Sequence, residues 1–156
     1  MRFFRLLALV FSLYGSCALA ASPLPTGAGQ FKFRATPEFA DKPLTVWYYR
    51  PARVDAQTKV LFVMHGAKRN GEDYRDDWQK HAERYNFLLV VPEFSARHFR
   101  AEQYSLGNAV QPDHKRWSFL LIERLFDEIR TREPQTAPRY YLYGHSGGAQ
   151  FVHRFM

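Results

Sequence analysis

Two kinds of hydrophobic pattern alternate along the chain. Residues 30–35 alternate phenylalanine with basic side chains, and residues 44–50 are rich in β-branched and aromatic residues, so both segments are predicted as strands. Residues 60–64 and 87–91 are uninterrupted apolar runs, which are typical of strands covered on both faces by helices. A last apolar segment, residues 140–143, is predicted as a further strand.

Helical spacing of apolar residues fills the intervals between the later strands. Trp78, Ala82 and Tyr85 follow one another at i, i+4 and i+7. Asp76 and Asp77 precede them, and negative charge there suits the first turn of a helix.

A second helical stripe begins after Asp113, which is predicted to be the N-cap, and stops near Pro134. Its apolar positions are Trp117, Leu121, Leu125 and Ile129. A last helix is predicted from Ala149 to Met156. The order of elements is therefore β, β, β, α, β, α, β, α, which predicts an α/β fold with a mostly parallel twisted sheet flanked by helices.

A long connection spans residues 93–111, where some irregular helix is expected. Long loops in compact domains often line sites, so its aromatic residues Phe99 and Tyr104 are the predicted groove residues. Trp78 and Trp117 fall on helical stripes and are predicted to lie in the core.

The N-terminus has the pattern of a secretory signal peptide over residues 1–20. Arg2 and Arg5 precede a short apolar run, and Ala18-Leu19-Ala20 provides the small residues of a cleavage site. The mature chain would begin at Ala21, outside the cytoplasm, either secreted or periplasmic. The run is too short for a stable membrane span. Lipidation of Cys17 is the alternative. Residues 21–29, rich in Pro and Gly, are predicted to be a flexible lead-in.

Composition excludes several other classes of protein. A single cysteine rules out a disulfide within the chain and a zinc site built from cysteine pairs, and no metal or cofactor is expected. The formal net charge is +7, from 22 Lys and Arg against 15 Asp and Glu. Because these charges are scattered and form no basic stripe, nucleic acid is not an expected partner.

The strongest chemical signal is a G-x-S-x-G sequence between the last strand and the last helix. Its members are Gly144, His145, Ser146, Gly147 and Gly148. A serine on such a tight bend has an exposed hydroxyl, and it needs glycine on both sides to avoid steric clashes. A Walker loop would have Lys at the position of Ala149, and no dinucleotide fingerprint is present. Ser146 is therefore the predicted nucleophile.

A second signal ends the first buried strand. His65 and Gly66 stand where a loop must bring a backbone N–H close to a substrate carbonyl. The predicted oxyanion donors are the N–H groups of Ala67 and Gly147. His65 is expected to orient the loop by hydrogen bonds rather than to act in catalysis.

Together, the strand ending in His65-Gly66 and the strand ending in the G-x-S-x-G sequence resemble the α/β-hydrolase superfamily, and most closely its secreted esterase and polyhydroxyalkanoate-depolymerase-like branch. The resemblance covers residues 31–156 and implies that residues 30–156 are the N-terminal part of such a domain. It also implies that the strand over residues 140–143 is central in the whole domain. The triad acid and base would follow the serine, so the sequence is expected to be a fragment that is inactive by itself.

None of the other histidines is expected to be the base. His153 should point away from the Ser146 hydroxyl because it lies seven residues into the last helix, and His98 and His114 precede the bend. The leading hypothesis is a serine hydrolase that cleaves small or polymeric carboxylic esters through an acyl-enzyme. A peptidase on the same fold and a non-catalytic binding module that keeps the pocket remain open alternatives.

Overall fold

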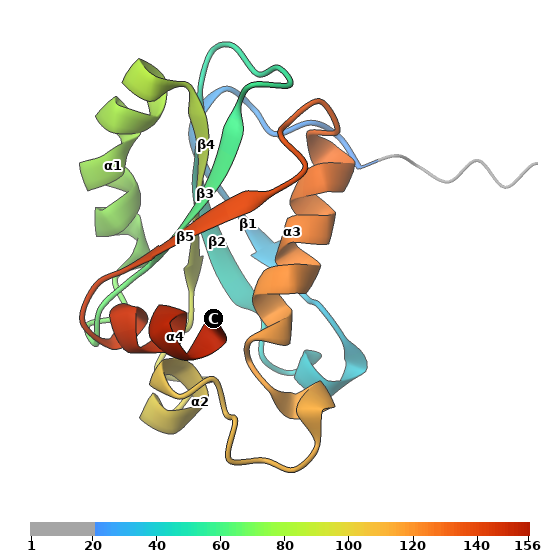
Figure 1. Ribbon diagram of the computed structural model, residues 1–156, viewed down its shortest axis with the longest axis vertical. Helices are drawn as coiled ribbons and strands as arrows, with labels where there is room; N and C mark the ends of the chain where they lie inside the picture. The colour runs from blue at the N-terminus through green and yellow to red at the C-terminus, as the bar shows by residue number, and fades with distance from the viewer. Residues whose placement is uncertain (1–20) are drawn as a thin grey trace, which may run out of the picture.

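The computed structural model describes residues 21–156, so the predicted signal peptide, residues 1–20, lies outside the described residues. A five-stranded sheet has helices on both faces (Figure 1). The strands are β1 (Gly27–Phe33), β2 (Leu44–Arg50), β3 (Lys59–Met64), β4 (Phe87–Glu93) and β5 (Tyr140–Gly144). The α-helices are α1 (Gly71–Tyr85), α2 (Ala101–Ser105), α3 (Leu120–Arg132) and α4 (Gly147–Phe155), and the 3₁₀ turns are η1 (Pro37–Phe39) and η2 (His114–Arg116).

The sheet order is β1-β2-β4-β3-β5. The first two pairings, β1 with β2 and β2 with β4, are antiparallel, whereas β3 is parallel to both β4 and β5. The uninterrupted apolar runs are the central strands β4 and β3, as the sequence predicts. Among residues 21–156, β5 forms one edge of the sheet. The α/β class is confirmed, with a mixed sheet.

Two hydrophobic clusters lie on opposite faces of the sheet. On one face, Val63 and Leu89 pack with Ala82 of α1. On the other face, Phe62 packs with Leu125 of α3 and with Phe151 of α4. Because β3 and β5 are parallel, their carboxyl ends lie at the same end of the sheet. The loops leading to α1 and α4 lie close together there (Figure 1).

Several element boundaries differ from those predicted. Strand β1 begins at Gly27, inside the stretch 21–29 that the sequence assigns to a lead-in, and Leu24 in that stretch is buried. The Leu24 amide donates a hydrogen bond to Glu133, which also forms a buried ion pair with Arg50. Tertiary contacts therefore order residues whose composition indicates flexibility.

The predicted start of the second helical stripe, which corresponds to α3, was wrong. Asp113 caps η2, where its carboxylate accepts a hydrogen bond from the Lys115 amide, and α3 begins only at Leu120. Trp117 lies between the two elements and is half-buried, and the His114 ring is tilted against it with the ring centroids 4.2 Å apart.

The predicted groove residues were also wrong. Tyr104 and Phe99 are fully buried in the aromatic cluster around Phe94 and Phe151. In the part of the chain that the structure describes, no helix combines the length and apolar content that crossing a bilayer requires.

Candidate active site

Ser146 lies at the bend between β5 and α4. Its backbone angles, φ 53° and ψ −116°, fall outside the regions that non-glycine residues normally adopt, a conformation that costs about 1–3 kcal/mol. Serine commonly caps a helix, but the Ser146 side chain makes no capping hydrogen bond to α4. Ser146 is exposed to solvent at this bend.

The two outer glycines of the bend are required by close backbone contacts. A Cβ on Gly144 would lie 2.3 Å from the carbonyl oxygen of Gly148. A Cβ on Gly148 would lie 2.2 Å from the carbonyl oxygen of Met64 at the end of β3. Since real Cβ atoms do not approach other atoms so closely, any side chain at either position would push α4 away from the sheet.

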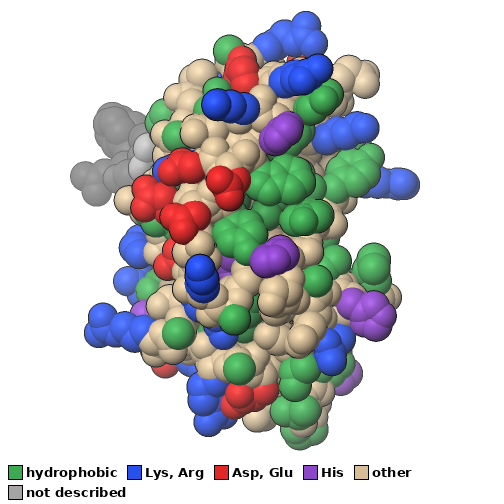
Figure 2. Space-filling view, turned by 90° about the vertical axis from the view of Figure 1, so that its left-hand side faces the viewer, with side chains coloured by type: hydrophobic (Ala, Val, Ile, Leu, Met, Phe, Trp, Pro, Cys, Tyr) green, Lys and Arg blue, Asp and Glu red, His purple; other side chains and the backbone are tan. Residues whose placement is uncertain are grey.

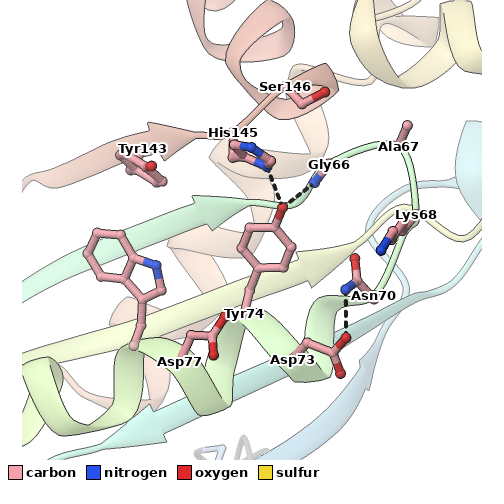
Figure 3. A pocket seen from close by; sticks show the side chains of 11 residues that line it. Gly66, Ala67, Lys68, Asn70, Asp73, Tyr74, Asp77, Tyr143, His145 and Ser146 are labelled. Atoms are coloured by element: carbon pink, nitrogen blue, oxygen red, sulfur yellow. Dashed lines mark hydrogen bonds between the residues drawn. The ribbon is translucent and has the colours of Figure 1, made fainter.

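Across from Ser146, the loop after β3 is fixed by one phenol group. The Tyr74 hydroxyl, on α1, accepts a hydrogen bond from the Gly66 amide at 3.0 Å. The same hydroxyl lies 2.7 Å from Nδ1 of His145, the residue before Ser146 (Figure 3). Tyr74 thus ties the loop to the bend.

This arrangement leaves the next amide, that of Ala67, facing the bend. The Gly66 amide is engaged by Tyr74, and the Gly66 carbonyl accepts a hydrogen bond from the Arg69 amide at 3.1 Å. A Cβ on Gly147 would lie 3.8 Å from the Ala67 nitrogen, so the two residues face each other. Gly147 is the first residue of α4, where a backbone N–H has no acceptor within the helix.

His65 lies beneath this loop and is fully buried. Its Nδ1 donates to the Gly66 carbonyl at 2.9 Å, and its Nε2 accepts from the Phe94 amide at 3.0 Å. Both ring nitrogens are therefore engaged in the neutral form. Burial lowers the pKa of His65 from 6.5 to about 4.

The depressed pKa of His65 predicts an acid-sensitive stability. Between pH 6.5 and 4 the unfolded chain binds a proton at His65 that the folded protein does not. The stabilisation that neutral His65 gives to the folded state is therefore fully present above pH 6.5. It is lost as the pH falls from 6.5 to 4, which lowers the free energy of unfolding by roughly 3 kcal/mol in total. The free energy of unfolding is measured with urea at pH 7 and at pH 4 for the wild type and for His65→Asn. We expect the decrease between the two pH values to be larger in the wild type by about 3 kcal/mol. Equal falls in the two proteins would contradict the assignment.

Arg69 supports the same loop from the other side. It has a positive φ of 59°, and its guanidinium lies 4.5 Å above the Tyr104 ring and donates to the Phe94 carbonyl. The Tyr104 hydroxyl in turn donates to the His65 carbonyl at 2.6 Å. Burial lowers the pKa of the Arg69 guanidinium and raises the pKa of the Tyr104 hydroxyl.

A pocket of about 550 Å³ opens beside Ser146 and runs along α1. Its lining combines the predicted site residues with side chains to which the sequence assigned no role in a site, namely Lys68, Asn70, Asp73, Tyr74, Asp77, Trp78 and Tyr143. Trp78 packs against Tyr143 at 4.9 Å, so it serves the core and the pocket together. Tyr74 extends the stripe of Trp78 and Ala82 by one turn, which is the sequence signal that could have revealed it.

The remaining histidines lie apart from the Ser146 hydroxyl. Within residues 21–156, no histidine forms a hydrogen bond with it; His81 stacks on Tyr85, and His153 is exposed near the end of α4. Over the same residues, no three His, Asp or Glu side chains gather to hold a metal ion.

A serine on a strained strand-to-helix bend, facing an amide-bearing loop at the carboxyl edge of a sheet of order 1-2-4-3-5, defines the fold of an α/β hydrolase. The chain belongs to the α/β-hydrolase superfamily, to its depolymerase-like branch, and corresponds to the N-terminal half of the fold.

Solved structures carry this assignment. Poly(aspartic acid) hydrolase-1 from Sphingomonas sp. KT-1 is 40% identical with a TM-score of 0.77, over 85% of this chain and 51% of that one. A poly(3-hydroxybutyrate) depolymerase from Bordetella parapertussis is 37% identical with a TM-score of 0.76, over 84% and 47%. The chain thus spans about half the length of these proteins.

A more distant structure shares the fold alone. It is described as a dienelactone hydrolase from Klebsiella pneumoniae subsp. pneumoniae MGH 78578, with 17% identity and a TM-score of 0.56, over 78% of this chain and 50% of that one. No protein-family model matches the sequence, and comparison with curated proteins finds no significant relative.

Proposed function

We propose that the protein is a serine hydrolase that cleaves carboxylic esters through an acyl-enzyme. One observation carries the proposal: the Ser146 hydroxyl is held exposed on a strained bend, beside a pocket and opposite the Ala67 amide. Strain of this kind persists only where the surrounding structure enforces it, and it is concentrated at functional sites.

The proposed reaction has two halves. Ser146 Oγ attacks the ester carbonyl carbon while its proton passes to a general base, and the N–H groups of Ala67 and Gly147 stabilise the oxyanion. The C–O bond to the alcohol then breaks, and the alcohol leaves with that proton. Water attacks the acyl carbon and gives up a proton to the same base. The bond from that carbon to Ser146 Oγ then breaks, and the base returns the proton to Oγ as the carboxylic acid leaves.

The general base and its carboxylate partner are proposed to lie outside residues 21–156. Each nitrogen of His65 is engaged in the core, His145 is bonded to Tyr74, and His153 is exposed on α4. Without a base the serine hydroxyl stays protonated and weakly nucleophilic, so residues 21–156 by themselves are expected to be inactive or nearly so.

The matched structures favour a polymeric substrate. They support two kinds of scissile bond, an ester and an amide. A depolymerase of poly(3-hydroxybutyrate), named for a polyester, is 37% identical, which supports ester cleavage. A poly(aspartic acid) hydrolase, named for a polyamide, is 40% identical, which makes amide cleavage on the same site the second candidate. The ratio of acyl-ester to matched amide turnover separates the two.

Covalent labelling tests the proposal. We expect a fluorophosphonate to add one phosphonyl group to the full-length protein, and peptide mass spectrometry to locate it on Ser146. The control is the same protein after heat denaturation, which should not react because the reactivity depends on the folded bend. An unlabelled Ser146 in the folded full-length protein would end the hydrolase proposal.

We also propose that the protein acts outside the cytoplasm, secreted or periplasmic. The support is the pattern of basic, apolar and small residues over residues 1–20. Residues 21–156 contain no cysteine, which is compatible with an oxidising compartment.

A further inference from the structure

The walls of the pocket beside Ser146 combine flat aromatic rings with carboxylates. Tyr74 and Trp78 on α1 and Tyr143 on β5 supply the rings, and Asp73 and Asp77 on α1 supply the carboxylates. Figure 2, which views the α1 side of the molecule, shows acidic side chains gathered next to a hydrophobic patch that also carries histidine. Ring faces and carboxylates are both attractive to a cation.

The carboxylates that line the pocket are not neutralised by neighbouring cations. Within residues 21–156, neither Asp73 nor Asp77 forms an ion pair, and Asp73 only accepts a hydrogen bond from the side-chain amide of Asn70 at 2.6 Å. The other carboxylates nearby on α1 are neutralised, because Glu72 and Asp76 both form ion pairs with the buried Arg75.

One cation, Lys68, faces the same pocket and opposes them. It lies beside the oxyanion loop, whereas Asp73 and Asp77 follow one another along α1 (Figure 3). The lining therefore carries two negative charges against one positive charge. This balance is opposite in sign to that of the chain, whose formal net charge is +7. The negative charge is thus a local property of this pocket.

We infer that the pocket selects substrates that carry an ammonium group on the part that extends from the scissile ester along α1. The cation would lie against the rings of Trp78 and Tyr143 with the carboxylates of Asp73 and Asp77 beside it. A polyanionic substrate would meet repulsion at the same place. The inference rests on the proposed hydrolase function and adds the charge of the substrate to it.

Three phosphonate probes of matched size test the inference on the full-length protein. Each carries the same reactive fluorophosphonate, joined to a trimethylammonioethyl, a 3,3-dimethylbutyl or a carboxyethyl group. We expect the cationic probe to label Ser146 about tenfold faster than the neutral one, and the anionic probe to be slowest. Because the carboxylates are exposed to solvent, the preference should shrink as salt is added.

Variants of the lining should move this preference in opposite directions. Asp73→Asn combined with Asp77→Asn should lower the cationic-to-neutral rate ratio to about two, which leaves the contribution of the rings. Lys68→Gln should raise the ratio about threefold. The matched control is Asp127→Asn, which removes an exposed carboxylate from α3 and should leave the ratio unchanged.

The outcomes separate the inference from the function it rests on. Equal labelling of Ser146 by the cationic and neutral probes, or a ratio that the Asp73 and Asp77 changes leave intact, would overturn the charge selectivity and leave the hydrolase proposal standing. Failure of all three probes to label Ser146 would remove the hydrolase proposal, and the selectivity with it.

Discussion

Replacing Ser146 by Ala is expected to lower kcat/KM of the full-length protein by about 10⁵-fold, because the proposed acyl-enzyme forms on the Ser146 hydroxyl. The bend should persist, since alanine tolerates the φ of 53° about as well as serine and the serine hydroxyl makes no capping bond. Substrate binding should persist as well. The measurement is hydrolysis of a chromogenic ester, with the unfolding midpoint recorded alongside.

A second serine provides the control for this result. Ser95 follows β4 at the same edge of the sheet, where its hydroxyl accepts a hydrogen bond from the Arg97 amide. Ser95→Ala should change the rate by less than about twofold, as expected for a surface substitution away from the reacting atoms. Retention of more than a small fraction of the activity by Ser146→Ala would show that another residue is the nucleophile.

The sheet could be predicted because its central strands are specified by local sequence. Uninterrupted apolar runs require cover on both faces, and that requirement alone places β3 and β4 inside the sheet. The start of α1 could not be predicted in this way. Its first turn is polar, and α1 begins at Gly71 because the Gly71 amide donates to Glu93, which also accepts from the Trp47 indole. These are contacts between distant segments.

The candidate site also has one part that the sequence reveals and another that depends on contacts between distant segments. The bend around Ser146 is apparent in the sequence because its geometry demands glycine at neighbouring positions. Tyr74 was missed because its role arises from a hydrogen bond to His145, 71 residues away in the chain. Asp77 was assigned only to the first turn of a helix and Asp73 was given no role, since nothing in the local pattern shows that this side of α1 faces the end of β5.

Replacing Gly148 by Ala should destabilise the fold by about 3 kcal/mol, at the upper end of what overpacking costs. The new Cβ would lie 2.2 Å from the Met64 carbonyl oxygen and 2.6 Å from that of His65. Both are backbone atoms of β3 and the residue after it, so neither can rotate away. Relief requires α4 to move outward, and urea unfolding of the variant measures the cost.

The adjacent glycine makes the matched comparison. A Cβ on Gly147 would meet the Ser105 hydroxyl at 3.2 Å, a side-chain atom that can move, so Gly147→Ala should change stability by less than about 1 kcal/mol. The same substitution at two neighbouring positions would then cost different amounts of stability, because only the Cβ at Gly148 would clash with the sheet. Equal destabilisation by both would show that the turn responds to lost glycine flexibility. In that case close contact with β3 would not be what holds Ser146 and the Gly147 amide in place.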